Sequence, residues 1–403
     1  MVNTPKANAV VGQSGGPTAV INSSLVGVIE ETAKYPEIKN LYGAIHGVAG
    51  IIKDDFIDLK KLPADTLEVV AASPSSALGS SRDKPDKNYC TRILDVFKKR
   101  DIRYFFYIGG NDSANTAYII NEMAVEAGYD LRVFHIPKTV DNDLLVNDHC
   151  PGFGTAAKFV ASALIGDDLD NRALAGVKID VIMGRHAGFL TAASVLGKQR
   201  DDYGPHLVYV PERGIAIDIF LSDVEKIYKK YNRCVVAVSE GICDTEGVTW
   251  AERLAKKKEI DSHGNVQLSG TGALADFLSG LVKINLGVKR VRADTFGYLQ
   301  RSFAGLQSKV DAREARWCGR HAVQYAAKEV SGSVAIRRIG NGIDYKVELF
   351  RTELSNVAEK TKPMPDEFIN SHGNGITNSF IEYAMPLVDG LPKTEYLGDY
   401  PRV

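Results

Sequence analysis

Short apolar runs along the chain are each followed by a glycine-rich or polar turn, and then by apolar positions at helical spacing. The apolar runs predict strands over residues 8–12, 41–50 (ending in a tight turn), 104–108, 131–136, 175–183, 207–210 and 234–239, and a last pair within 332–350. The helical spacing predicts helices over 19–29, 89–100 and 309–330. It also predicts one helix that begins after Asn111 and another that runs through Ile165. Strands that alternate with helices are typical of α/β sheets covered on both faces. We therefore expect two doubly wound, three-layer α/β/α domains with the active site in a cleft between them.

The length of the chain also favours two domains. Its 403 residues exceed what one hydrophobic core usually supports. We place the first crossing between the domains near residues 148–153, and we expect a surface loop at the charged, glycine-containing stretch 256–266.

Two polar clusters stand directly after neighbouring apolar runs. The run 104–108 ends in Gly109-Gly110-Asn111-Asp112, and the run 131–136 ends in the sequence PKTVDND at 137–143. Because the carboxyl ends of parallel strands share one edge of a sheet, both clusters are expected at a ligand-binding edge. Glycines and a helix N-terminus suit a phosphate, while one lysine and three carboxylates suit a phosphate, a divalent metal and a proton acceptor. Taken alone, the first cluster is equally well explained as an ordinary strand-to-helix turn.

Other turns carry weaker signals. Residues 14–18 (SGGPT) form a further strand–glycine–helix turn, but it is neither a Walker A loop nor a dinucleotide fingerprint. Arg82 follows a loop of small residues and could contact a phosphate, although a solvated loop charge explains it better. Gly184-Arg185 ends a strand at an expected helix start and suits an anion. Glu240 follows a fully apolar strand, where a carboxylate is costly unless it faces a cleft.

The composition excludes several classes of protein. Hydrophobic residues make up 44% and charged residues 25%, as in ordinary globular proteins, and the net charge of −1 gives no reason to expect a nucleic-acid or membrane partner. The five cysteines are scattered and form no CxxC pair, which favours reduced thiols in a cytoplasmic protein over disulfides or a zinc site. We see no signal peptide and no apolar run of membrane-spanning length.

The motifs taken together resemble those of the phosphofructokinases over about residues 8 to 320. They are SGG near the start, GSSR at 79–82, GGND at 109–112, PKTVDND at 137–143, GFGT at 152–155, MGR at 183–185, SEG at 239–241 and YLQR at 298–301. Asp112 and Lys138 stand where the ATP-dependent branch has glycines, and they resemble the pyrophosphate-dependent branch. An aspartate at 112 would crowd and repel a nucleotide's α-phosphate, whereas pyrophosphate ends before it.

The resemblance implies reversible phosphoryl transfer from pyrophosphate to the 1-hydroxyl of fructose 6-phosphate. It implies a pyrophosphate domain of residues 1–150 plus about 300–365 and a sugar-phosphate domain of about 151–299 plus 366–403, in a homodimer or homotetramer. Asp141 would be the base, assisted by Asp112 and Lys138, and Gly15 and Arg82 would hold pyrophosphate, with Mg²⁺ at Asn111 and Asp143. The implied sugar-phosphate residues are Thr139, Val140, Asp141, Met183, Gly184, Arg185, Glu240, Tyr298, Leu299, Gln300 and Arg301, with Arg292 lent by a neighbouring subunit.

Three positions depart from the ATP-dependent pattern. Asn111 replaces an aspartate near the metal, Tyr298 replaces a histidine, and Gly176 stands in place of a second arginine that bridges subunits. Three alternatives stay open: an ATP-dependent phosphofructokinase, a non-catalytic regulatory subunit of the same fold, and a lipid or NAD kinase with a similar glycine turn.

Overall fold

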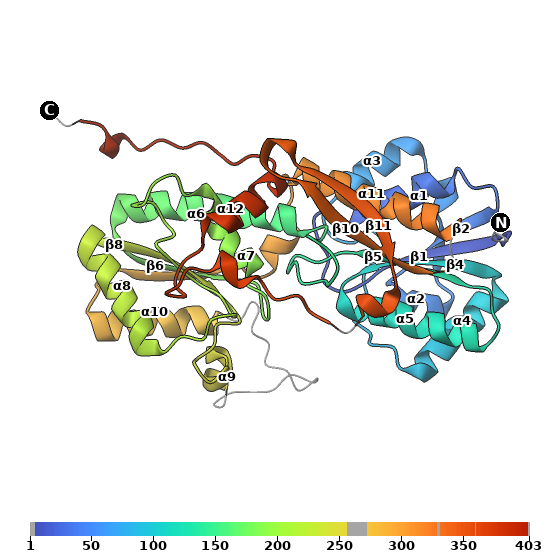
Figure 1. Ribbon diagram of the computed structural model, residues 1–403, viewed down its shortest axis with the longest axis horizontal. Coiled ribbons are helices and arrows are strands. Elements are labelled where there is room, and N and C mark those ends of the chain that lie inside the picture. The colour runs from blue at the N-terminus through green and yellow to red at the C-terminus, as the bar shows by residue number, and fades with distance from the viewer. Residues whose placement is uncertain (1–4, 256–271, 329–330, 359, 402–403) are drawn as a thin grey trace. The chain divides into compact units, whose positions relative to one another are not determined.

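The computed structural model describes residues 5–255, 272–328, 331–358 and 360–401 (Figure 1). They form two compact units. Unit 1 comprises Met1–Ala156 and Arg301–Lys362, and unit 2 comprises Ala157–Gln300 and Pro363–Val403. The surface loop expected at 256–266 lies outside the described residues.

Unit 1 is built on a seven-stranded sheet in the order β11-β10-β5-β4-β1-β2-β3. Its strands are β1 (Ala7–Gln13), β2 (Ile38–Ala44), β3 (Phe56–Asp58), β4 (Ile102–Gly109), β5 (Arg132–Pro137), β10 (Gly332–Gly340) and β11 (Lys346–Thr352). Neighbours pair in parallel from β10 to β2, and only β3 and β11 pair antiparallel, at the two edges. The turns after β1, β4 and β5 therefore share one edge of the sheet.

Helices cover both faces of this sheet. On one face lie α1 (Ile21–Thr32), α3 (Ala64–Ala72) and α11 (Lys309–Ala326), and on the other lie α2 (Val48–Lys53), α4 (Lys87–Lys99) and α5 (Asn111–Glu126), as Figure 1 shows. Alternate residues of a strand point to opposite faces of the sheet. Val11 and Phe106 pack toward α1 and α11, whereas Val10 and Phe105 pack toward α4 and α5. Because both faces of β1 and β4 are buried, these central strands read as nearly continuous apolar runs.

Unit 2 has a smaller sheet in which every pairing is parallel, in the order β7-β8-β6-β9. The strands are β6 (Gly176–Ile182), β7 (Leu207–Tyr209), β8 (Arg233–Ser239) and β9 (Val291–Thr295). Helices α8 (Ile217–Tyr231), α9 (Trp250–Ala255) and α10 (Ala273–Leu286) pack on one face, and α6 (Phe153–Leu174) lies over the other (Figure 1). Two further short helices are α7 (Phe189–Ala192) and α12 (Asn378–Ala384).

Short 3₁₀ helices occur in both units. They are η1 (Leu59–Lys61), η4 (Gly342–Asp344) and η5 (Leu354–Asn356) in unit 1, and η2 (Ala193–Gly197), η6 (Asp366–Phe368), η7 (Met385–Leu387) and η8 (Leu397–Asp399) in unit 2, with η3 (Gly297–Arg301) ending at the boundary.

The predicted α/β class with helices on both faces of mostly parallel sheets is confirmed, and several details are wrong. The apolar stretch 41–50 is not one strand, because β2 ends at Ala44 and α2 begins at Val48. The helix after Gly184-Arg185 begins only at Phe189, so these two residues lie in a turn. Strand β9 and helices α10 and α12 were not predicted. In β9 the charged side chains of Arg292 and Asp294 alternate with apolar ones, as expected of an edge strand rather than a buried run.

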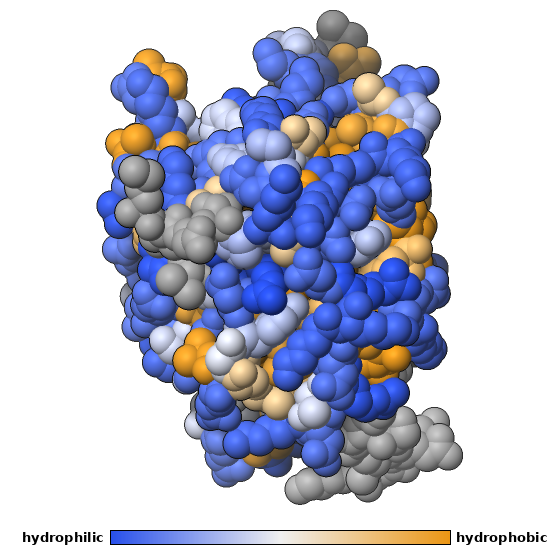
Figure 2. Space-filling view, turned by 90° about the vertical axis from the view of Figure 1, so that its right-hand side faces the viewer, coloured by the Kyte–Doolittle hydropathy of each residue, from blue (hydrophilic) through white to orange (hydrophobic). Residues whose placement is uncertain are grey.

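Within the described ranges, no helix combines the length and the apolar character needed to cross a bilayer. Figure 2 shows one face of the molecule, on which the coloured residues are mostly hydrophilic and the apolar ones lie in small groups.

Candidate active site

The glycine turn after β1 and the loop before Arg82 meet in unit 1. Gly15 has φ +75°, and its backbone N–H donates to Ser81 O at 2.9 Å, while Ser80 Oγ donates to Gly15 O at 2.6 Å. A side chain at position 15 would be strained, and its Cβ would lie 3.1 Å from Lys138 Nζ. The turn therefore presents bare backbone beside a lysine.

Two buried amides, neither of them predicted from the sequence, hold the loop that precedes Arg82. Gln13 Oε1 accepts from Leu78 N at 3.0 Å, and Asn22 Oδ1 accepts from Ala77 N at 2.9 Å. Asn22 Nδ2 also donates to Ser73 O at 2.9 Å. A buried Gln or Asn satisfies several backbone groups at once, so these residues fix a loop that has no regular structure of its own. The only sequence signal for them is an amide at the end of an apolar run.

Lys138 is the buried cation of this region. It follows β5 directly, its backbone N–H donates to Gly109 O at 3.0 Å, and its Nζ donates to Gly16 O at 2.8 Å. Only 4% of the residue is exposed. Burial lowers the pKa of Lys138 to about 8, against the opposing effect of the Asp141 and Asp143 carboxylates, while Arg301 and Arg82 lower it further.

Asp141 and Asp143 follow in the same loop. The backbone N–H of Asp141 donates to Thr139 Oγ1 at 3.1 Å, and Asn142 between the two acids has φ +60°. Asp143 Oδ2 accepts from Asn111 Nδ2 at 3.2 Å. Burial raises the pKa of Asp143, although Lys138 and Lys362 oppose this.

Asn111 contacts Asp143 through its amide nitrogen and also carries a buried amide oxygen. It is the first residue of α5, and its Oδ1 is buried and accepts no hydrogen bond from any described residue. An amide oxygen and a carboxylate side by side are ligands of the kind that hard divalent cations prefer. The donor types of Asn111 and Asp143 therefore suit a divalent cation, and their role as metal ligands stays a prediction.

Asp112, Arg82 and Arg301 surround this group in different ways. Asp112 lies in the first turn of α5, is largely exposed, and has its Oδ2 3.3 Å from Lys84 Nζ. Arg82 is exposed, whereas Arg301 is half-buried and its Nη1 would lie 2.6 Å from a Cβ at Gly16. The ion pair of Asp112 with Lys84 was not predicted.

A second group of predicted residues lies at the carboxyl ends of β6 and β8 in unit 2. Met183 N donates to Gln300 Oε1 at 3.2 Å, and Glu240 N donates to Ile182 O at 2.8 Å. Gly184 has φ +141°, and a Cβ at Gly241 would lie 2.1 Å from Arg185 O. The MGR and SEG turns thus touch each other through glycines. Of the other predicted residues, Thr139 and Val140 are buried in unit 1, and Arg185, Tyr298 and Leu299 are exposed in unit 2.

Arg292 is separated from that group. It lies on β9 opposite Lys178 of β6, and Lys178 precedes Met183 by five residues, or about 16 Å along a strand. There it lines a cavity of about 320 Å³ together with Lys178, Asp167 and Asp294. Within one chain, Arg292 therefore does not join the residues at the carboxyl end of β6.

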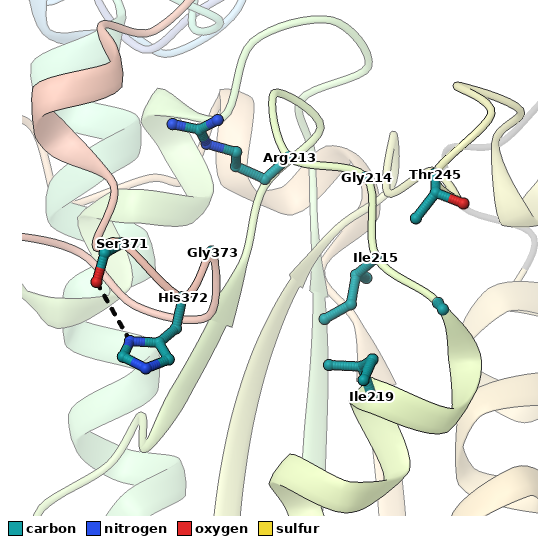
Figure 3. A pocket seen from close by; sticks show the side chains of 9 residues that line it. Arg213, Gly214, Ile215, Ile219, Thr245, Ser371, His372 and Gly373 are labelled. Carbon is teal, nitrogen blue, oxygen red and sulfur yellow. Dashed lines mark hydrogen bonds between the residues drawn. The ribbon is translucent and has the colours of Figure 1, made fainter.

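Another pocket, of about 270 Å³, contains none of the predicted residues. Arg213, Thr245 and His372 are among the residues that line it, and Ile215 and Ile219 point toward His372 (Figure 3). Ser371 Oγ lies 3.3 Å from His372 Nδ1. This pocket has no carboxylate in its lining and is not the site that the motifs predict.

Comparisons with known proteins agree with the motifs. A model of the phosphofructokinase family matches residues 8–326. A pyrophosphate--fructose 6-phosphate 1-phosphotransferase of Rhodospirillum rubrum is 55% identical over 396 residues, which cover 98% of this chain and 97% of that protein. One of the same name from Xanthomonas campestris is 38% identical, over 97% of this chain and 94% of that protein.

A solved structure is also similar. The pyrophosphate-dependent phosphofructokinase of Marinobacter aquaeolei is 34% identical, with a TM-score of 0.85 over 98% of this chain and 95% of that one. The match in sequence and in structure extends over nearly the whole length, and it confirms the resemblance drawn from the motifs. The chain belongs to the phosphofructokinase family.

Proposed function

We propose that this protein transfers a phosphoryl group reversibly from pyrophosphate to the 1-hydroxyl of fructose 6-phosphate, giving fructose 1,6-bisphosphate and phosphate. The observation that carries the proposal is Lys138, a buried ammonium held against the Gly15-Gly16 turn beside two carboxylates. A fixed cation at a phosphate cradle stabilises the charge of a small, highly charged donor. The names of relatives that are 55% and 38% identical support the same donor and acceptor.

Four of the predicted residues of unit 1 act directly on the reacting groups or on pyrophosphate in this scheme. Asp141 accepts the proton of the sugar hydroxyl, and Lys138 stabilises the charge on the transferred and leaving phosphates. Gly15 and Arg82 bind pyrophosphate. Phosphoryl transfer requires mainly positioning and charge stabilisation, so a rigid turn with a buried lysine suits it.

Phosphofructokinases are phosphotransferases that generally need a divalent metal. We propose Mg²⁺, held by Asp143 and by Asn111 Oδ1, whose buried position without a donor among the described residues supports a cation there. When bound, the ion would neutralise phosphate charge. Because Asn111 is uncharged, Asp143 must supply most of the protein's negative charge at this site.

The sugar phosphate is assigned to unit 2, and the cleft expected between the units remains part of the proposal. In this proposal, the residues of unit 2 that bind the sugar phosphate are Met183, Gly184, Arg185, Glu240, Tyr298, Leu299 and Gln300. Unit 1 contributes Thr139, Val140 and Arg301. The separation of Arg292 from Met183 supports a role in the site of a neighbouring subunit, and hence a homodimer or homotetramer. The five free cysteines, four of them buried, support a reducing compartment such as the cytoplasm.

Replacing Asp112 by glycine is expected to raise kcat/KM with ATP relative to pyrophosphate. The substitution removes a carboxylate near the N-terminus of α5, where a nucleotide's α-phosphate would lie. The ratio of kcat/KM for the two donors measures the effect. Asp65→Gly, which removes an exposed acid from the first turn of α3, is the matched control and should leave the ratio unchanged. If ATP use stays undetectable, Asp112 is not the sole barrier, and Asp112→Gly combined with Lys138→Gly tests whether the pair is.

The function itself is tested by supplying fructose 6-phosphate and Mg²⁺ with either pyrophosphate or ATP and measuring fructose 1,6-bisphosphate. Product with pyrophosphate alone is expected. Product with ATP alone would overturn the donor assignment but leave the acceptor in place. No product with either donor would favour a regulatory subunit.

A further inference from the structure

A buried histidine anchors the far end of the loop that carries Asp141 and Asp143. His149 is 2% exposed and lies in the same connection between β5 and α6. Its Nδ1 is 2.7 Å from Asp148 Oδ2, and its Nε2 is 2.6 Å from Glu314 Oε2 on α11. A carboxylate only accepts hydrogen bonds, so a ring placed between two carboxylates is satisfied on both sides when both nitrogens carry protons. The geometry therefore favours an imidazolium ion.

Further charged and titratable groups surround the two carboxylates that hold this histidine, among them Lys362 near Asp148 and Asp311 near Glu314. Tyr345 donates its hydroxyl to Glu314 Oε1 at 2.9 Å, and Arg338 Nε of β10 donates to Asp148 Oδ2 at 3.0 Å. Arg313 Nη2 lies 3.7 Å from Glu314 Oε1. Arg338 lies beside Asp148 and the half-exposed Arg313 lies near Glu314, so a protonated His149 adds a buried positive charge between the two carboxylates. A neutral His149 would leave the buried Glu314 with only the half-exposed Arg313 as a cationic partner among the described residues, which is costly.

Backbone contacts connect this network to the two acids of the site. Cys150, the residue after His149, donates its N–H to Asn142 Oδ1 at 2.9 Å, and Asn142 lies between Asp141 and Asp143. On the other side, Lys362 Nζ donates to the carbonyl oxygens of Asn147 and Asp148, both at 2.8 Å, and Lys362 N donates to Asp143 O at 2.7 Å. A shift of His149 would reach Asp141 and Asp143 through these bonds.

We propose that His149, held as an imidazolium between Asp148 and Glu314, is a positioning residue that fixes the Asp141–Asp143 loop in its reactive geometry. This role rests on the proposed function, because the loop matters only if its acids act on substrate. Burial alone would lower the pKa of His149, but the hydrogen bonds and charges of Asp148 and Glu314 outweigh it and raise the pKa above its ordinary value.

The charge state is tested first, by ¹⁵N NMR of the histidine rings in the substrate-free protein at neutral pH. Two protonated ring nitrogens are expected for His149. His135 is the internal control: it is equally buried, but burial lowers its pKa to about 4, so its ring should carry one proton. A single protonated nitrogen on His149 would overturn the proposal. This readout needs no substrate, so it is independent of the proposed function.

Kinetics of His149→Gln test the positioning role. A displacement of about 1 Å at a reacting group lowers rates by roughly 10²-fold, so kcat per titrated active site should fall by up to about that factor, with smaller changes in both KM values. His321→Gln on α11, whose ring bonds only Trp317 O among the described residues, is the matched control and should keep wild-type kcat. Unchanged kcat in folded His149→Gln would overturn the proposal.

If His149→Gln does not fold, Tyr345→Phe tests the same network, because it removes only the hydroxyl that holds Glu314. This variant should lower kcat in the same way but less. Wild-type kcat in Tyr345→Phe would then count against the proposal. If the wild-type enzyme uses ATP instead of pyrophosphate, the donor assignment fails, and the ratio of variant to wild-type kcat with ATP still reports on His149.

Discussion

Asp141→Asn is expected to lower kcat by about 10²–10⁴-fold, the usual contribution of a general base. Asparagine has nearly the same shape, and the bond from residue 141 N to Thr139 Oγ1 uses only backbone at 141, so the loop should keep its conformation. What is lost is the ability to take the proton of the sugar hydroxyl. Because the base acts in the transition state, KM for both substrates should change little. Steady-state rates in both directions of the reaction measure the effect.

Asp130→Asn is the matched control for this variant. Asp130 is exposed and lies just before the start of β5, whereas Asp141 lies beyond its end. The control should retain wild-type kcat. If Asp141→Asn also did so, Asp141 would not be the base, and the role of the PKTVDND cluster would have to be reassigned.

Lys138→Met should lower kcat by about 10²–10³-fold, the range for removing one group that stabilises charge in a transition state. In the wild-type enzyme, kcat/KM for pyrophosphate should fall as the pH rises through about 8, where the free enzyme loses the Lys138 proton. The sign follows from the lowered pKa: the charged, active form exists below this value and is lost above it. A pH profile of kcat/KM on both sides of this value checks the expectation.

Lys138→Met is also the control for that profile, because it has no proton to lose at position 138. The fall near pH 8 should disappear in the variant, and it should persist in Lys87→Met, which removes an exposed lysine from the start of α4. A fall that survives in Lys138→Met would belong to another group and would contradict the assignment.

The residues that sequence could place are those next to buried parallel strands. Runs such as 104–108 and 234–239 are buried on both faces of a sheet and are therefore continuously apolar. The ends of such runs are visible in the sequence, and so are the polar residues that follow them, which include Asn111, Lys138 and Glu240. The edge strand β9 carries charges at alternate positions and was missed, although Arg292 within it was named from the family resemblance. Element ends were less predictable where a short helix replaces the end of an apolar stretch, as α2 does.

Contacts between residues far apart in the chain could not be predicted from the sequence. The contacts of Lys84 with Asp112, of Gln13 and Asn22 with the loop before Arg82, and of His149 with Glu314 join residues that are up to 165 positions apart, as from His149 to Glu314. No local pattern encodes such pairs, because each side chain alone is compatible with an exposed surface position. They become visible only once the topology of the sheet and the path of α11 are known.

The discontinuous path of unit 1 has a consequence for protein synthesis. Strand β5, which leads into Lys138, lies between β4 and β10, and β10 is translated almost 200 residues after β5. While the ribosome produces residues 157–300, β5 therefore has an unpaired edge, of the kind that pairs readily with other chains. Closing this long loop carries an entropic cost before β10 can pair. The strand nearest the proposed chemistry is enclosed only late in translation, and the nascent chain has to keep it from aggregating until then.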